Sequence, residues 1–148
     1  MRKLVLAVVA TMALTGVTLQ ARAQTTKSAA GSEEVFWVLT LSVPQGNMDK
    51  FKQLATEMTE STKNEPGALA FECSASSDQS TVDLYERYRD SGATVTHVQS
   101  FGANFSKRFL ALVKPTRFVV YGAPDAKVKE VIAGFNPIYM TPFDGFTR

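Results

Sequence analysis

The sequence is poor in the residues that build disulfides and metal sites. Its 148 residues include one cysteine, Cys73, and one histidine, His97. A single cysteine cannot form an intrachain disulfide, and the spacings typical of zinc sites, such as Cys-x-x-Cys, do not occur. We therefore expect no metal and no built-in cofactor. Cys73 lies in an apolar, strand-like segment, which favours a buried thiol over a reactive one.

Motifs for nucleotides and nucleic acids are also missing. The chain has no glycine-rich phosphate loop and no Gly-x-Ser-x-Gly nucleophile turn. Its formal charge is +2, but three cationic residues lie in the first 23 positions, so the remainder carries −1. Lysine and arginine form no stripe. The charge pattern therefore argues against nucleic acid and anionic membranes as partners.

The N-terminal residues 1–23 have the pattern of a secretion signal. Arg2 and Lys3 precede an apolar run that ends at Leu19, and Ala21-Arg22-Ala23 supplies a small-x-small cleavage site. The run is shorter than the roughly 20 residues that cross a bilayer, which disfavours a stable membrane anchor. We expect export to the periplasm or the medium after cleavage following Ala23, with residues 24–34 as a flexible leader.

The rest of the chain alternates between strand and helix patterns. Strands are expected at residues 35–43, 68–75, 81–88 and 117–121. Helices are expected after the N-cap candidates Asn47, Asp90 or Ser91, and Asp125, with Gly102 breaking the second. The order strand, helix, strand, strand, helix, strand is typical of the α+β, ferredoxin-like split βαβ fold with an antiparallel sheet.

Both faces of the first predicted strand carry apolar side chains. Val35 and Trp37 alternate with Phe36 and Val38. Helices can cover only one face, so we expect a homodimer that covers the other. The domain should end near residue 122. Residues 123–148 then form an extension with a helix and an aromatic tail, which we expect to pack on the domain or across a dimer.

Two segments resemble a known family. Glu65-Pro66-Gly67 followed by Phe71 and Glu72 is similar to the E-P-G-x-x-x-Y/F-E segment of antibiotic biosynthesis monooxygenase domains. The run from Glu86 to His97, with Tyr88, Asp90 and Ala93, is similar to that family's E-x-W/Y-x-D-x-x-A-x-x-x-H segment. Both occur in the expected order, within a resemblance that covers residues 35–122.

The resemblance implies a dimeric α+β barrel with a pocket between sheet and helices. It also implies small aromatic or quinol-like substrates that several members oxidise with O2, without flavin, haem or metal. Functions within the family vary more than the fold, and some members are isomerases.

His97 is the leading catalytic candidate. An imidazole titrates near neutrality, and in an apolar pocket it could act as the general base that deprotonates a bound phenol. The alternative is a packed helix residue with its ring nitrogens bonded to protein groups. Both interpretations stay open from the sequence.

The remaining candidates surround His97 in the predicted fold. Glu72 and Glu86, on paired strands, could orient His97 or bind a substrate hydroxyl, or could form ordinary ion pairs. Aromatic side chains could form the walls of a substrate pocket or belong to the core, namely Trp37, Phe71, Tyr85, Tyr88 and Phe101.

The preferred interpretation is a cofactor-independent monooxygenase-like homodimer acting on a small aromatic or quinol-like molecule. The first alternative is a protein that uses the same pocket to bind an apolar small molecule without turnover. The second is a structural protein whose pocket is filled. An open cavity beside a free His97 nitrogen would favour the enzyme, and the absence of a cavity would favour the structural protein.

Overall fold

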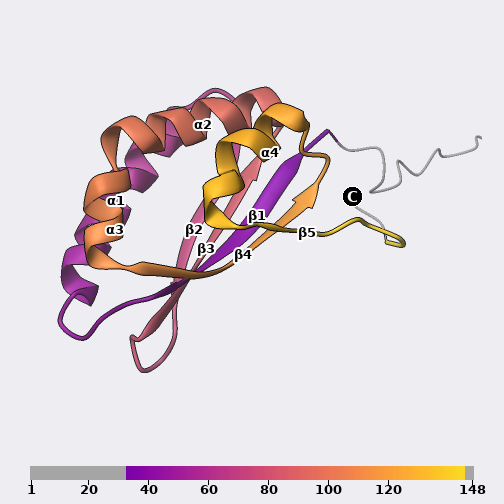
Figure 1. Cartoon of the computed structure of the whole chain (residues 1–148). Coiled ribbons are helices and arrows are strands. Elements are labelled where there is room, and N and C mark those ends of the chain that lie inside the picture. The colour runs from indigo at the N-terminus through magenta and orange to yellow at the C-terminus, as the bar shows by residue number, and fades with distance from the viewer. Residues whose placement is uncertain (1–32, 146–148) are drawn as a thin grey trace, which may run out of the picture.

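Helices cover one face of a mostly antiparallel sheet in this computed structural model, which describes residues 33–145 (Figure 1). The strands are β1 (Val35–Ser42), β2 (Ala68–Ala75), β3 (Thr81–Tyr88), β4 (Lys114–Gly122) and β5 (Ile138–Tyr139). The helices are α1 (Met48–Lys63), α2 (Ser91–Asn104), α3 (Ser106–Leu112) and α4 (Ala126–Ile132), followed by the 3-10 turn η2 (Ala133–Phe135). The α+β, ferredoxin-like prediction is confirmed.

The sheet has the strand order β2-β3-β1-β4-β5, and β1 lies at its centre. The first four strands pair antiparallel, whereas β5 pairs parallel to β4. In β1, Val35, Trp37, Leu39 and Leu41 are buried, while the alternate residues are more exposed. This period of two assigns Trp37 to the face under the helices and Phe36 to the outer face.

The helices cover the sheet through apolar and aromatic side chains. Phe51 of α1 and Phe101 of α2 both contact Phe109 of α3, with ring centroids 6.0 and 5.2 Å apart. Phe51 and Phe109 are almost fully buried. Burial of each such ring contributes roughly 1.5–3 kcal/mol, so these aromatic contacts fix where α1 and α2 lie above the sheet.

Two of the three predicted N-caps act through their side chains. The Asp90 carboxylate accepts a hydrogen bond from the Ala93 amide at 2.8 Å, and Asp125 does the same for Val128. Asn47 precedes α1 as expected, but its side-chain amide instead donates to the Leu112 carbonyl at 2.9 Å. Asn47 therefore ties the start of α1 to the end of α3.

The break in the second helical region comes three residues later than predicted. Gly102 lies inside α2, and the chain leaves helical geometry at Phe105, with φ −125°. A methyl group at Gly102 would meet nothing within 4 Å, so this glycine is simply an exposed helix position. The break at Phe105 resets the helical phase and lets Phe109 turn into the core.

The C-terminal extension lies against the domain. Its helix α4 buries Val128 and Ile132, and β5 adds a short strand beyond β4 that the sequence did not predict. Phe143 is fully exposed. At the other end, Glu34 of the predicted leader accepts two hydrogen bonds from Arg87.

The predicted signal peptide and most of the leader, residues 1–32, lie outside the described residues. Within residues 33–145, no helix combines the length and apolarity needed to cross a membrane. The prediction of a buried Cys73 is wrong, because this residue is exposed on β2. The physical reason is that β2 is an edge strand, so no further strand shields its outer flank.

Candidate active site

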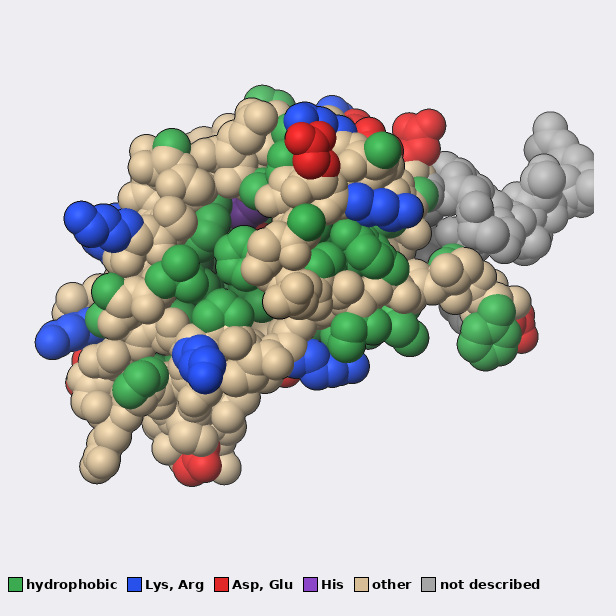
Figure 2. Space-filling view, viewed as in Figure 1, with side chains coloured by type: hydrophobic (Ala, Val, Ile, Leu, Met, Phe, Trp, Pro, Cys, Tyr) green, Lys and Arg blue, Asp and Glu red, His purple; other side chains and the backbone are tan. Residues whose placement is uncertain are grey.

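An apolar cavity lies between the sheet and the helices. It encloses about 470 Å³ of space between atoms, including its open mouth. Its lining is almost entirely apolar, and the two ionisable side chains among the lining residues are Glu86 and His97. Figure 2 shows this hollow as a green-lined depression with the histidine colour visible inside it. An apolar pocket with a few convergent polar groups is typical of small-molecule sites.

Strand register explains how Glu86 reaches the cavity. Glu86 on β3 lies opposite Trp37 on β1 and Phe71 on β2, so the three residues form one row on the face under the helices. Tyr88, two residues further along β3, points the same way and donates a hydrogen bond to Glu86 Oε2 at 2.6 Å. The sheet therefore presents one carboxylate between two aromatic walls.

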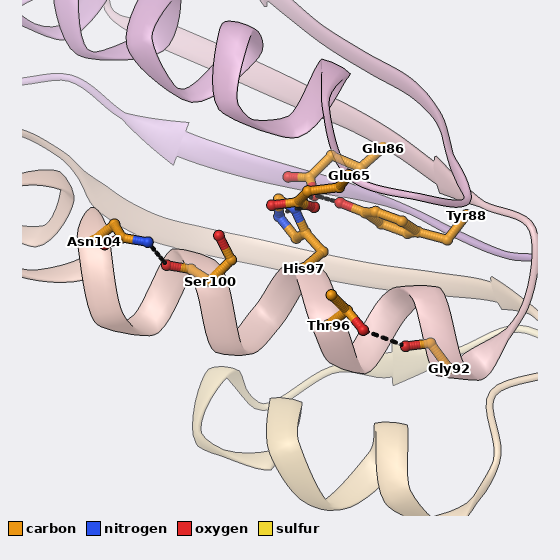
Figure 3. Close-up of polar contacts among 8 residues, drawn as sticks. All are labelled: Glu65, Glu86, Tyr88, Gly92, Thr96, His97, Ser100 and Asn104. Atoms are coloured by element: carbon orange, nitrogen blue, oxygen red, sulfur yellow. Dashed lines mark hydrogen bonds and ion pairs between the residues drawn. The ribbon is translucent and has the colours of Figure 1, made fainter.

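His97 lies between two carboxylates (Figure 3). Its Nδ1 is 2.8 Å from Glu65 Oε2, and its Nε2 is 3.2 Å from Glu86 Oε2. Glu65 comes from the loop after α1, His97 from α2 and Glu86 from β3. Three separate elements are thus joined through one imidazole ring, and both ring nitrogens have protein partners.

These contacts shift the pKa values of the group. Burial alone would lower the pKa of His97, but the charge of Glu86 and the hydrogen bond to Glu65 outweigh it and raise the pKa to about 9. For Glu86, burial favours the neutral form, yet the charge and hydrogen bond of His97 hold its pKa below the usual 4.5. At neutral pH, His97 is therefore an imidazolium beside a carboxylate.

Gly67 brings Glu65 close to His97. Gly67 has φ +92°, and a β-carbon there would lie 2.7 Å from the Ala93 side chain in the first turn of α2. Only glycine permits both the left-handed backbone and this close approach. The Glu65-Pro66-Gly67 segment can therefore pack against the start of α2, one turn before His97.

The predicted wall residues divide between the two faces of the sheet. Trp37, Phe71 and Phe101 line the cavity, as expected. Tyr88 does not line it: the residue is fully buried, and its hydroxyl positions Glu86. Tyr85 pairs with Val38 and Glu72 in the outer-face rows, so it lies away from the cavity.

Of the predicted catalytic residues, the structure brings together His97 and Glu86 but not Glu72. Glu72 is exposed and neighbours Phe71, which points to the opposite face. Adjacent residues of a strand cannot both face the cavity. Glu72 therefore does not contact His97 in this structure.

Several residues of the site had no predicted role. Glu65 belongs to the Glu65-Pro66-Gly67 motif, but no role at the site was assigned to it. Its position two residues before Gly67 was the available signal. The C-terminal extension contributes Ile132 and Phe135 to the lining. Within residues 33–145, no cluster of three or more His, Cys, Asp or Glu side chains is arranged to hold a metal ion.

Comparison with known proteins identifies the domain. Residues 35–117, more than half of the chain, match the sequence profile of the family described as Antibiotic biosynthesis monooxygenase. The chain belongs to this family. The match covers β1 through the first part of β4 and includes Glu65, Glu86 and His97, whereas α4 and η2 lie beyond it. No curated protein matches the chain by sequence.

Solved structures with the same fold are distant in sequence. MupZ from Pseudomonas fluorescens superimposes with a TM-score of 0.72 at 21% identity, covering 79% of this chain and 91% of MupZ. A putative antibiotic biosynthesis monooxygenase from Nitrosomonas europaea gives 0.56 at 21% identity, over 62% and 90% of the two chains. SnoaB, a cofactor-independent oxygenase from Streptomyces nogalater, gives 0.56 at 15% identity, over 64% and 97%. At these identities the likeness establishes the fold.

Proposed function

We propose that this protein oxidises a small aromatic hydroxy compound of the quinol type with O2, without a cofactor of its own. The observation that carries the proposal is the apolar cavity whose ionisable lining residues are Glu86 and His97. Membership of the monooxygenase family and the oxygenase named among the fold relatives support the reaction class.

The cavity favours a flat, compact ligand. Its space between atoms is about 470 Å³ including the open mouth, and large aromatic side chains from both the sheet and the helices line it. Rings on opposite sides leave a space suited to a flat molecule. An aromatic ring can insert between Phe71, Trp37 and Phe101 by stacking and apolar contact, with small shifts of these side chains.

Glu86 is the group we assign to the substrate hydroxyl. A carboxylate offers about four acceptor positions. Tyr88 donates to Glu86 Oε2, and His97 Nε2 lies 3.2 Å from the same oxygen atom, so the carboxylate can accept from a further donor. A phenolic O–H pointing at Glu86 would complete the set and orient the ring in the cavity.

His97 has a second role in this proposal. Because it is an imidazolium at neutral pH, it does not offer a free base in the resting state. It instead stabilises the negative charge that develops on the substrate oxygen as the proton passes from that oxygen to Glu86. The prediction from the sequence that His97 acts as the base requires the imidazolium to lose a proton first. That proton could leave through Glu65, whose side chain is 13% exposed.

The reaction balances without another oxidant. A hydroquinone and O2 give a hydroxyquinone and water. The substrate supplies four electrons: two reduce the oxygen atom that enters the ring and two reduce the atom that leaves as water. Loss of the phenolic proton raises the electron density of the ring and favours electron transfer to O2. The cavity limits competing reactions by excluding bulk water.

Oxygen uptake tests the proposal. Purified mature protein, freed of metal and flavin, should consume O2 in a saturable way with at least one member of a hydroquinone panel. Glu86→Gln should lower the rate by about 100-fold, because the amide cannot accept the proton. Glu57→Gln is the matched control. Glu57 lies on α1, is exposed, and forms an ion pair with Arg108 of α3.

The two roles for His97 give different results in the same assay. His97→Gln removes the positive charge and should reduce uptake while leaving Glu86 in place. Equal uptake by wild type and a folded His97→Gln variant would remove His97 from the mechanism. Equal uptake by wild type and Glu86→Gln would exclude Glu86 as proton acceptor.

A binding protein is the second candidate, because both His97 nitrogens already have carboxylate partners. It would hold the aromatic molecule without turnover. No oxygen uptake, combined with a melting temperature that rises with hydroquinone concentration, would favour this function. The open cavity favours both of these functions over a structural protein with a filled pocket.

We also propose that the exported protein is a homodimer that meets through the outer face of the sheet. Phe36 and Tyr121 stack there, with ring centroids 5.2 Å apart and planes 4° from parallel, beside Val38. Such an apolar sheet face is suited to a second copy. Sedimentation of the secreted protein tests whether it is a dimer. Determination of its N-terminal residue, which should be Gln24, tests the cleavage. A monomer or an uncleaved chain would contradict these expectations.

A further inference from the structure

Two hollows meet at a pair of phenylalanine rings. Phe118 and Phe135 line the apolar cavity, and both also line a second hollow at the edge of β4. This second hollow encloses about 510 Å³ of space between atoms, including open solvent. Its other lining residues are Pro115, Thr116, Arg117, Asn136 and Ile138. The two rings lie edge to face with centroids 6.0 Å apart, so they form the partition between the hollows.

The partition lies across β1 from the polar end of the cavity. Glu86 is on β3, β1 comes next in the sheet, and Phe118 is on β4. With strands about 4.8 Å apart, a ligand bound at Glu86 and running across β1 reaches the partition after roughly 10 Å. The second hollow lies at the edge of β4, on the side away from β1, so it extends the path that runs from Glu86 across β1.

The two rings are held very differently. Phe118 is buried, pairs with Leu39 across the ladder and packs edge to face with Trp37, with centroids 5.5 Å apart. Phe135 is only partly buried and ends the short turn η2. It is followed by Asn136, whose φ is +51°, and by a strand of two residues. Phe135 is therefore the part of the partition that substitution can remove without disturbing the sheet.

We propose that Phe135 determines the length of ligand that the cavity accepts. The inference rests on the proposed use of this cavity for aromatic hydroxy compounds. In the wild-type protein the Phe135 ring stops a ligand at the edge of β4 and selects compact molecules. Without the ring, the cavity continues into the second hollow, and a ligand with a longer apolar tail is accommodated.

A series of 4-alkylphenols from methyl to octyl measures this length directly. Calorimetric affinity for the wild type should rise about fourfold for each methylene that is buried, then stop rising at a cut-off length. In Phe135→Ala the cut-off should move by at least two methylenes. Phe143→Ala is the matched control, because Phe143 is fully exposed on the same C-terminal segment and should leave the cut-off unchanged.

Other outcomes overturn the inference. An unchanged cut-off in folded Phe135→Ala would do so. Should Phe135→Ala unfold, Phe135→Leu keeps an apolar side chain and should give an intermediate cut-off, and a wild-type cut-off there would also overturn it. Absence of alkylphenol binding to either protein would overturn both this inference and the proposed function. Binding with the expected cut-offs but no oxygen uptake would overturn only the enzymatic proposal.

Discussion

His97→Leu is expected to lower the free energy of unfolding by about 3–5 kcal/mol at pH 7, the range found when one partner of a buried ion pair is removed. Leucine has nearly the volume of histidine, so the loss reflects charge rather than a new void. The variant leaves the buried Glu86 carboxylate without its cation. Glu65 is affected less, because it can gain water at the surface. Urea unfolding followed by circular dichroism measures the change.

A second substitution separates charge from packing. Adding Glu86→Gln to His97→Leu removes the buried charge, and Tyr88 can still donate to the amide oxygen. The double variant should recover more than half of the lost stability. A double variant no more stable than His97→Leu would show that the single loss came from packing.

The stability of the wild-type protein is expected to fall as pH rises from about 6.5 through 9. The folded state holds the pKa of His97 at about 9, whereas its ordinary value is 6.5. Between these values the folded protein binds more protons than the unfolded chain, so the stabilisation is complete below pH 6.5 and is lost through pH 9. The full difference corresponds to about 3 kcal/mol. Unfolding curves at intervals of half a pH unit would measure it.

At acid pH the stability depends on pH in the opposite sense. The pKa of Glu86 is lowered in the folded state, so its stabilisation is present above pH 4.5 and is lost as pH falls further. His97→Leu/Glu86→Gln lacks both groups and should show a flatter profile in both windows. Tyr88 also faces Glu86, but burial and the nearby charge raise its pKa, so it stays neutral throughout. A wild-type profile as flat as that of the double variant would contradict the assignment.

Local sequence patterns were sufficient for most of the helices and strands but only partly for the site. Alternation in β1 and the cap at Asp90 depend on neighbours in the chain, and both were predicted. Alternation also contained information that the prediction did not use. Tyr85 and Tyr88 are three residues apart in one strand, so they must face opposite sides of the sheet.

Other features depend on contacts between distant segments and had no local signal. The pairing of β5 with β4 involves only two residues, which is too short for a periodic pattern. The approach of Glu65 to His97 depends on the space that Gly67 leaves beside Ala93. The protonation state of His97 follows from two carboxylates on other elements, so histidine alone suggested a base where the fold holds a cation.

Trp37 gives the site an optical reporter. It is the only tryptophan in the chain, it lines the cavity, and its ring centroid lies 6.4 Å from that of His97. Tryptophan emission from the native protein therefore originates at one wall of this cavity, with no second fluorophore of its kind to obscure it. The spectrum of the unmodified chain can be followed while molecules enter or the imidazolium loses its proton, without any attached label.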